Sequence, residues 1–183
     1  MRTAKDGALA LRAALRVGGG TISGLVDHGP LANRELGAPG PPQRAAEGPR
    51  AAGHEAEYEL LLEMILEGSL LHYGGPRVVA TDDPDLSLLL GDQLYALGLG
   101  RLAELGDLTS VAELADLISL LAQAQTASDR ELAEAVWKAS ATAVGWGPSG
   151  RHERAKALAR AGDAGAAAAL LEAAGEPGSP SRG

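Results

Sequence analysis

Hydrophobic residues recur along most of the chain with the three-to-four-residue spacing of an α-helix. The clearest segment is residues 55–73, EAEYELLLEMILEGSLLHY. Its apolar positions fall on one broad face, which is typical of a helix that packs against a core. Gly68 and Ser69 follow the first apolar run and predict a kink. The apolar positions are Leu61, Met64, Ile65, Leu70 and Leu71.

Four further helices are predicted after this one. The third of these four opens with Ser-Asp-Arg-Glu, the pattern of a capping box in which Ser128 is the N-cap. The last is interrupted by Gly-Asp-Ala-Gly at 162–165. Helices joined by short loops pack as antiparallel neighbours, so we expect an all-α fold, an antiparallel helical bundle. The predicted ranges are 83–105, 108–126, 128–144 and 151–174.

The first third of the chain has a different pattern. Residues 4–16 predict a short amphipathic helix, which the glycine-rich turn VGGGTISG at 17–24 ends. Residues 37–53, GAPGPPQRAAEGPRAAG, are rich in Pro, Gly and Ala and predict a linker or mobile loop. The expected parts of the chain are an N-terminal region at 1–53, a helical bundle at 54–174 and a disordered tail at 175–183.

Composition supports a helical fold and narrows the function. Hydrophobic residues make up 45% of the 183 positions but aromatic residues only 3%, so the core must consist mainly of Leu and Ala. The net charge of −8 leaves no basic stripe for nucleic acid. The absence of Cys excludes disulfides and cysteine-ligated metals. No uncharged window approaches the roughly 18 residues of a membrane span, and we expect a cytoplasmic protein.

Three short motifs resemble known sites but lack essential residues. The glycine-rich turn has no Lys at the position that a nucleotide-binding phosphate loop requires. The pairs His54-Glu55 and His152-Glu153 begin like zinc-protease motifs. However, Tyr58 and Lys156 stand where the second His ligand is needed. Both pairs are interpreted as solvated helix starts.

The acidic cluster Asp82, Asp83 and Asp85 admits two interpretations. Clustered carboxylates hold Mg²⁺ in phosphate-transfer sites. Asp83 followed by Pro84 is also a strong helix start, because an aspartate N-cap precedes a proline at the first helical position. Since carboxylates that share an ion on a helix usually lie one turn apart, we favour the cap.

Several segments, taken together, resemble the trans-type polyprenyl diphosphate synthases. The resemblance covers residues 55 to 145 and implies part of the isoprenoid synthase fold, with dimerisation through helices of this region. The segments that carry it are SLLHY at 69–73, GGPRVV at 74–79, LLLGDQLYALGLGRLAELGD at 88–107, ISLLAQAQ at 118–125 and Trp137-Lys138-Ala139.

The departures from that family's pattern concern its chemistry. Tyr73, Gly74 and Gly75 stand where the first aspartate-rich motif should follow His72. Of the paired arginines, only Arg77 has a counterpart. The second aspartate-rich motif is also absent. The resemblance implies that such carboxylates hold the Mg²⁺ that stabilises the departing diphosphate, so catalysis by this chain alone is not expected.

We therefore expect a polyprenyl-synthase-like protein without catalytic residues, metal or cofactor. It would serve as a non-catalytic partner of a full-length synthase or be a vestigial, self-associating homologue, with the helices at 86–105 and 108–126 as its interface. One alternative is residual, Mg²⁺-dependent prenyltransferase activity, and another is a helical scaffold unrelated to isoprenoids or a decayed gene. In the prenyltransferase alternative the diphosphate-binding residues are His72, Arg77, Asp92, Gln125 and Lys138.

Overall fold

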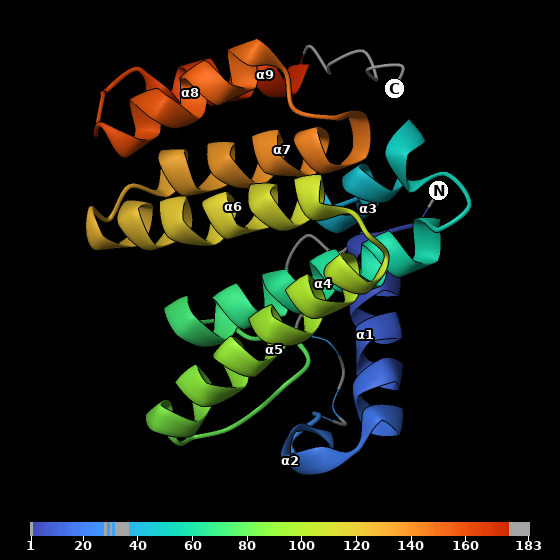
Figure 1. Cartoon of the computed structure of the whole chain (residues 1–183). Helices are drawn as coiled ribbons and strands as arrows, with labels where there is room; N and C mark the ends of the chain where they lie inside the picture. Colours follow the sequence, from blue (N-terminus) through green and yellow to red (C-terminus); the bar gives the residue numbers. More distant parts are fainter. Residues whose placement is uncertain (1, 28, 30, 32–36, 176–183) are drawn as a thin grey trace. The chain divides into compact units, whose positions relative to one another are not determined.

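The computed structural model describes residues 2–27, 29, 31 and 37–175 (Figure 1). Throughout this part of the chain the regular secondary structure is helical, apart from an isolated antiparallel bridge between Val26 and Val79. The predicted all-α fold is confirmed. The elements are α1 (Ala4–Gly18), α2 (Gly20–Ser23), α3 (Pro41–Ala46), the 3-10 turn η1 (Pro49–Ala51), α4 (Glu55–Tyr73), α5 (Pro84–Glu104), α6 (Leu108–Thr126), α7 (Arg130–Trp146), α8 (Gly150–Arg160) and α9 (Ala166–Gly175).

The chain forms two compact units. Unit 1 comprises Met1–Gln43 and Ala56–Leu105, and unit 2 comprises Arg44–Glu55 and Gly106–Gly183. This division differs from the expected boundary at residue 53, because residues 44–55 pack with α7 rather than with the N-terminal helix. Each unit therefore contains two separate stretches of sequence.

In unit 1, α4 and α5 approach closely through glycines. A Cβ at Gly91 would lie 3.0 Å from the Gly68 carbonyl oxygen, and a Cβ at Gly98 would lie 2.9 Å from Ile65 Cδ1. These glycines therefore allow two apolar helices to pack with little space between them. Helix α4 is continuous through Gly68 and Ser69, and Ser69 Oγ donates to the Leu66 carbonyl oxygen within it at 2.7 Å.

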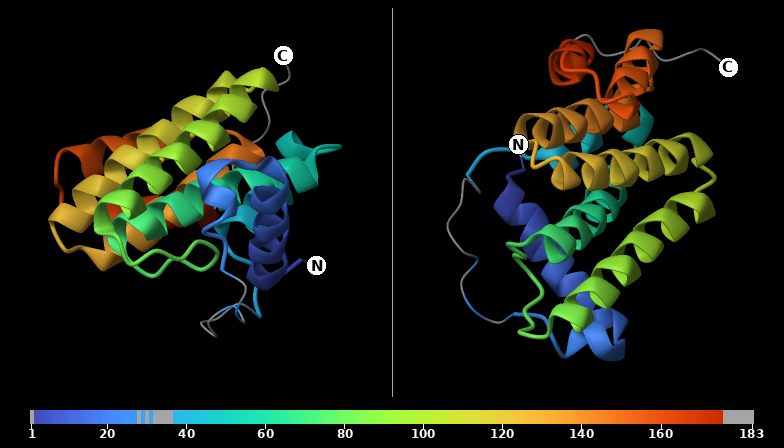
Figure 2. Two further views of the ribbon diagram at one scale, coloured as in Figure 1. Left: turned by 90° about the horizontal axis from the view of Figure 1, so that it is seen from below. Right: turned by 90° about the vertical axis from the view of Figure 1, so that its left-hand side faces the viewer.

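In unit 2, α6 packs along α7, as the right-hand view of Figure 2 shows, and α9 packs on α7 beside α8. The predicted break at 162–165 is confirmed by the gap between α8 and α9. The predicted capping box is wrong in its cap. Asp129, not Ser128, caps α7, and Ser128 has a φ of 56°, which reverses the chain before the helix.

The Pro/Gly/Ala-rich segment is not a linker in this structure. It holds α3 and η1, and Ala45, Ala46 and Ala51 are buried. Small residues make this packing close, since a Cβ on Gly48 would collide with the backbone of Gly145 in α7. The segment with α3 and η1 thus has the composition of a linker but packs tightly against α7. The predicted tail at 175–183 lies outside the described residues from 176 onward.

Within the described residues, no helix combines the length and apolar character that a membrane span requires.

Candidate functional site

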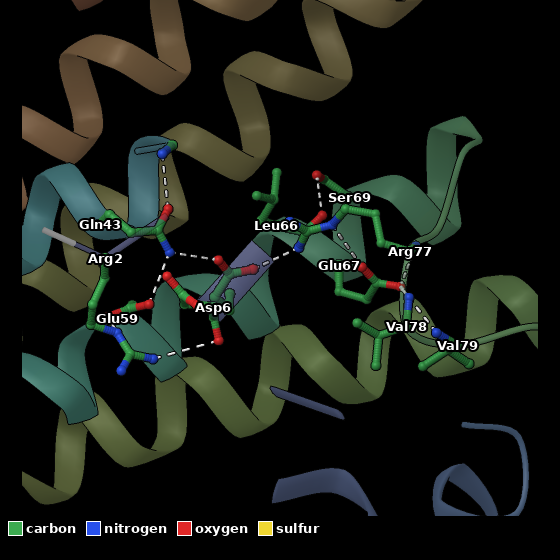
Figure 3. A network of polar contacts seen from close by, with 12 residues as sticks. Arg2, Asp6, Gln43, Glu59, Leu66, Glu67, Ser69, Arg77, Val78 and Val79 are labelled. Carbon is green, nitrogen blue, oxygen red and sulfur yellow. Dashed lines mark hydrogen bonds and ion pairs between the residues drawn. The ribbon is translucent and has the colours of Figure 1, made fainter. Parts of the chain in front are cut away.

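A row of glutamates lies inside unit 1. Glu59, Glu63 and Glu67 occupy successive turns on one side of α4 and are 3%, 0% and 0% exposed. Burying a carboxylate is costly unless it is paired and hydrogen-bonded. The contacts of this glutamate row therefore decide what the site can do (Figure 3).

One carboxylate oxygen of Glu67 accepts three backbone hydrogen bonds. The amide nitrogens of Arg77, Val78 and Val79 lie 2.8, 2.6 and 3.1 Å from its Oε1. Arg77 Nε lies 3.2 Å from the other oxygen, Oε2. Glu67 therefore holds the loop between α4 and α5 against α4.

The other two glutamates share one donor. Gln43 Nε2 lies 3.0 Å from Glu59 Oε1 and 2.9 Å from Glu63 Oε1. Arg77 Nη2 lies 2.6 Å from Glu63 Oε2, and Arg2 Nε lies 2.6 Å from Glu59 Oε2. Burial raises the pKa of Glu63 above its ordinary value, although the Arg77 guanidinium opposes this shift.

This arrangement does not suit a magnesium ion. Each carboxylate oxygen of the glutamate row already accepts a hydrogen bond or an ion pair from the protein. Mg²⁺ instead needs free carboxylate oxygens and retained waters in near-octahedral geometry. The glutamate row is thus built to join α4 to Gln43, to Arg2 and to the 77–79 loop.

The sequence contained a signal for the glutamate row that the apolar pattern hid. Glutamates spaced four residues apart within a helix point to the same side, and here the remaining sides of α4 are apolar. A helix without a polar outer face must be surrounded, so its charged row must be buried and paired.

The predicted diphosphate-binding residues divide between the two units. His72 and Asp92 meet in unit 1, with His72 Nε2 3.1 Å from Asp92 Oδ1 but without hydrogen-bond geometry. The His72 ring also stacks on Tyr95, with centroids 5.2 Å apart. Arg77 is occupied by the glutamate row. Gln125 and Lys138 belong to unit 2 and are exposed there.

The acidic cluster before α5 is a helix cap, as predicted. Asp83 accepts hydrogen bonds from the amides of Asp85 and Leu86 at 3.0 and 3.2 Å. Pro84 occupies the first turn, where its missing N–H costs nothing. This geometry accounts for Asp83 without a bound ion.

A second buried charge cluster joins α6 to α8 in unit 2, and it corrects one prediction. His152 is buried rather than solvated, and its Nε2 lies 2.8 Å from Glu113 Oε1. Lys156 Nζ lies 2.7 Å from Glu113 Oε2 and 2.8 Å from Asp116 Oδ2. The sequence hid this because Glu113 is 39 residues from His152, so no local pattern brings them together.

The same cluster contains a potential set of metal ligands. Ligand atoms of Glu113, His152 and Glu153 lie within 4.8 Å of one another. The Lys156 ammonium already contacts Glu153 Oε1 at 2.9 Å as well as Glu113. Burial alone would lower the pKa of Lys156, but hydrogen bonds to three carboxylates outweigh it and raise the pKa. A metal ion would therefore have to displace a firmly charged ammonium.

Asp116 makes the stability of unit 2 depend on pH. Partial burial would raise its pKa, but hydrogen bonds from Lys156 and Arg160 outweigh this and hold the pKa below its ordinary value of 3.8. A carboxyl whose pKa is lower when folded contributes stability above its unfolded pKa. That contribution is lost as the pH falls through the folded-state pKa.

We expect the stability advantage of the wild type over Asp116→Asn to be constant well above pH 3.8 and to shrink as the pH falls through and below that value. Urea denaturation of both proteins between about pH 2 and 7 measures this. Asp82→Asn removes the same charge from an exposed position and corrects for net charge. An advantage that grows toward low pH would contradict the prediction.

No family model, curated protein or solved structure matches the chain.

Proposed function

We propose that this protein is a non-catalytic, polyprenyl-synthase-like partner that binds a complete synthase through the outer face of α5. The observation that carries the proposal is that α5 is apolar but partly exposed. The helix PDLSLLLGDQLYALGLGRLAE has apolar residues on every side. A helix of this kind is normally covered all round.

Among the described residues, only one side of α5 is covered. Its buried positions are Leu90, Gly91, Leu94, Gly98 and Leu102. On the remaining sides Leu88 is 45% exposed, Leu89 65% and Leu97 38%. Several exposed leucines along one helix favour a protein-binding surface over a solvated one.

Gly100 supports a close helix–helix contact on this face. It lies in the interior of α5, where glycine is about 1 kcal/mol less favourable than alanine. A Cβ at Gly100 would meet no atom within 4 Å among the described residues, so packing inside the chain does not require the glycine. A partner helix that approaches α5 closely would explain it.

The charges of unit 1 support a non-catalytic role. Ionisation of an allylic diphosphate needs cations that are free to receive the leaving group. Arg77 is paired with Glu63 and Glu67 and is only 14% exposed in its side chain. The glutamate row likewise has no free oxygens for an ion, so the chain depends on a complete synthase for any role in isoprenoid synthesis.

The double variant Leu88→Gln/Leu89→Gln tests the interface. We expect it to weaken binding to the partner synthase at least tenfold, because a few apolar side chains usually carry much of an interface's free energy. Leu171→Gln is the matched control, since Leu171 in α9 is 45% exposed, as Leu88 is. The tagged proteins are compared by co-purification from the host lysate and mass spectrometry, then by titration with the recovered synthase.

Three results would count against this proposal. Recovery of no protein with both aspartate-rich motifs would support a helical scaffold unrelated to isoprenoids. Equal loss of binding in the α5 and α9 variants would remove α5 as the interface. Magnesium-dependent product from isopentenyl and allylic diphosphates with this chain alone would support residual prenyltransferase activity.

A further inference from the structure

Arg12 is a buried cation in unit 1. It lies on the side of α1 that also carries the buried Ala8, Leu11 and Leu15, and it is only 8% exposed. Its Nη1 donates to the Gly29 carbonyl oxygen at 2.9 Å. This is a neutral partner, so the positive charge is left without compensation at that contact.

The edge of the guanidinium that carries Nε and Nη2 donates no hydrogen bond to the described residues. Nε and Nη2 of Arg12 are buried and have no hydrogen-bond partner among the residues that the structure describes. No ion pair within 4.0 Å joins Arg12 to a carboxylate of the described residues. Arg12 is thus a buried guanidinium with two unused donors.

The other buried charges of the described chain are all compensated. The glutamate row is paired with Arg2 and Arg77, and Lys156 is paired with Glu113. An uncompensated buried charge costs several kcal/mol, and arginine cannot escape this cost by losing its proton. Arg12 therefore calls for an anion that comes from outside the described contacts.

The geometry of the unused donors specifies the type of anion. Nε–H and Nη2–H lie along one edge of the planar guanidinium and point in the same direction. Such an edge matches two oxygens of a carboxylate or phosphate group and binds them with parallel hydrogen bonds. We propose that Arg12 is the centre of an oxyanion-binding site in unit 1, on α1 beside the Gly29 carbonyl oxygen.

The burial of both donors limits the size of the ligand. An anion reaches them only if atoms that now cover them move aside, which favours a small oxyanion or the terminal oxyanion group of a larger molecule. The proposal concerns α1 and is independent of the α5 interface, so either can fail without the other.

Thermal unfolding in the presence of defined anions tests the site. Wild-type protein is titrated with inorganic phosphate, with acetate and with sodium chloride at matched ionic strength. We expect its unfolding midpoint to rise with the logarithm of the phosphate or acetate concentration, beyond the sodium chloride effect. A response to only one of the two oxyanions assigns the site to phosphate or to carboxylate groups.

Variants connect that response to Arg12. Arg12→Met should abolish the dependence on the anion, and Arg12→Lys should weaken it because lysine has no two-donor edge. Arg101→Met removes an exposed arginine from the same unit and should keep the full response. The Arg12 Nε–H resonance, followed by NMR, should shift on addition of phosphate or acetate, which reports binding even where a variant folds poorly.

Two results would overturn the proposal. One is a wild-type midpoint and an Nε–H resonance that respond to neither oxyanion. The other is an unchanged anion response in Arg12→Met. Glu35, which lies outside the described residues, provides a further comparison. If Glu35→Gln lowers the unfolding midpoint while the wild-type midpoint does not change with either anion, the chain supplies its own counter-ion and no ligand site exists.

Discussion

Replacing Glu67 with alanine is expected to lower the free energy of unfolding by about 3–5 kcal/mol. The side chain is fully buried, and it accepts hydrogen bonds from the amides of Arg77, Val78 and Val79. Its removal leaves these donors and one side of the Arg77 guanidinium without a partner in a site that water does not reach. Each unpaired buried group adds to the loss.

Urea denaturation measures this effect, and Glu104→Ala is the control. Glu104 is also in unit 1, near the end of α5, but it is exposed, so its loss should change stability by no more than about 0.5 kcal/mol. Glu67→Gln should fall between the two, because the amide keeps an acceptor oxygen but loses the charge that balances Arg77. A loss below about 1 kcal/mol in Glu67→Ala would show that the 77–79 loop does not depend on this carboxylate.

The second large effect is expected in unit 2, where Gly48→Ala should destabilise the protein by about 3 kcal/mol. A Cβ at Gly48 would overlap the backbone of Gly145, and no rotamer change relieves a collision with backbone atoms. The segment that contains η1 would have to move away from α7. That movement would strain the contacts of Arg50 with the Val144 carbonyl at 3.2 Å and with Asp107 at 2.7 Å.

The same substitution at Gly100 should have the opposite sign. Its Cβ would meet no described atom, and alanine is the better helix former, so Gly100→Ala should stabilise the isolated chain by about 1 kcal/mol. Thermal and urea unfolding of both variants measure the contrast. If Gly48→Ala were neutral, the close approach of η1 to α7 would be wrong. If Gly100→Ala also left synthase binding unchanged, it would remove the support that Gly100 gives to the proposed α5 interface.

The sequence by itself determined most of the helices. The predicted ranges 55–73 and 108–126 agree with α4 and α6. Their ends depend on local interactions, such as the Asp107 side chain that accepts from the Ser110 amide, and on the apolar spacing of neighbouring turns. Such signals involve residues a few positions apart, so they can be recognised without knowledge of the rest of the chain.

Only the tertiary structure decided which residues are buried and what each charge contacts. The 41–51 segment has the composition of a linker, but Gly48 brings it against α7, 97 positions along the chain at Gly145. The sequence around His152 is typical of a solvated helix start, but in the folded structure Glu113 from another helix lies beside it. The cost of burying a group depends on which distant segments cover it and which partners they bring. For that reason the partners of the glutamate row, the Lys156 cluster and the uncompensated Arg12 could not be predicted from local pattern.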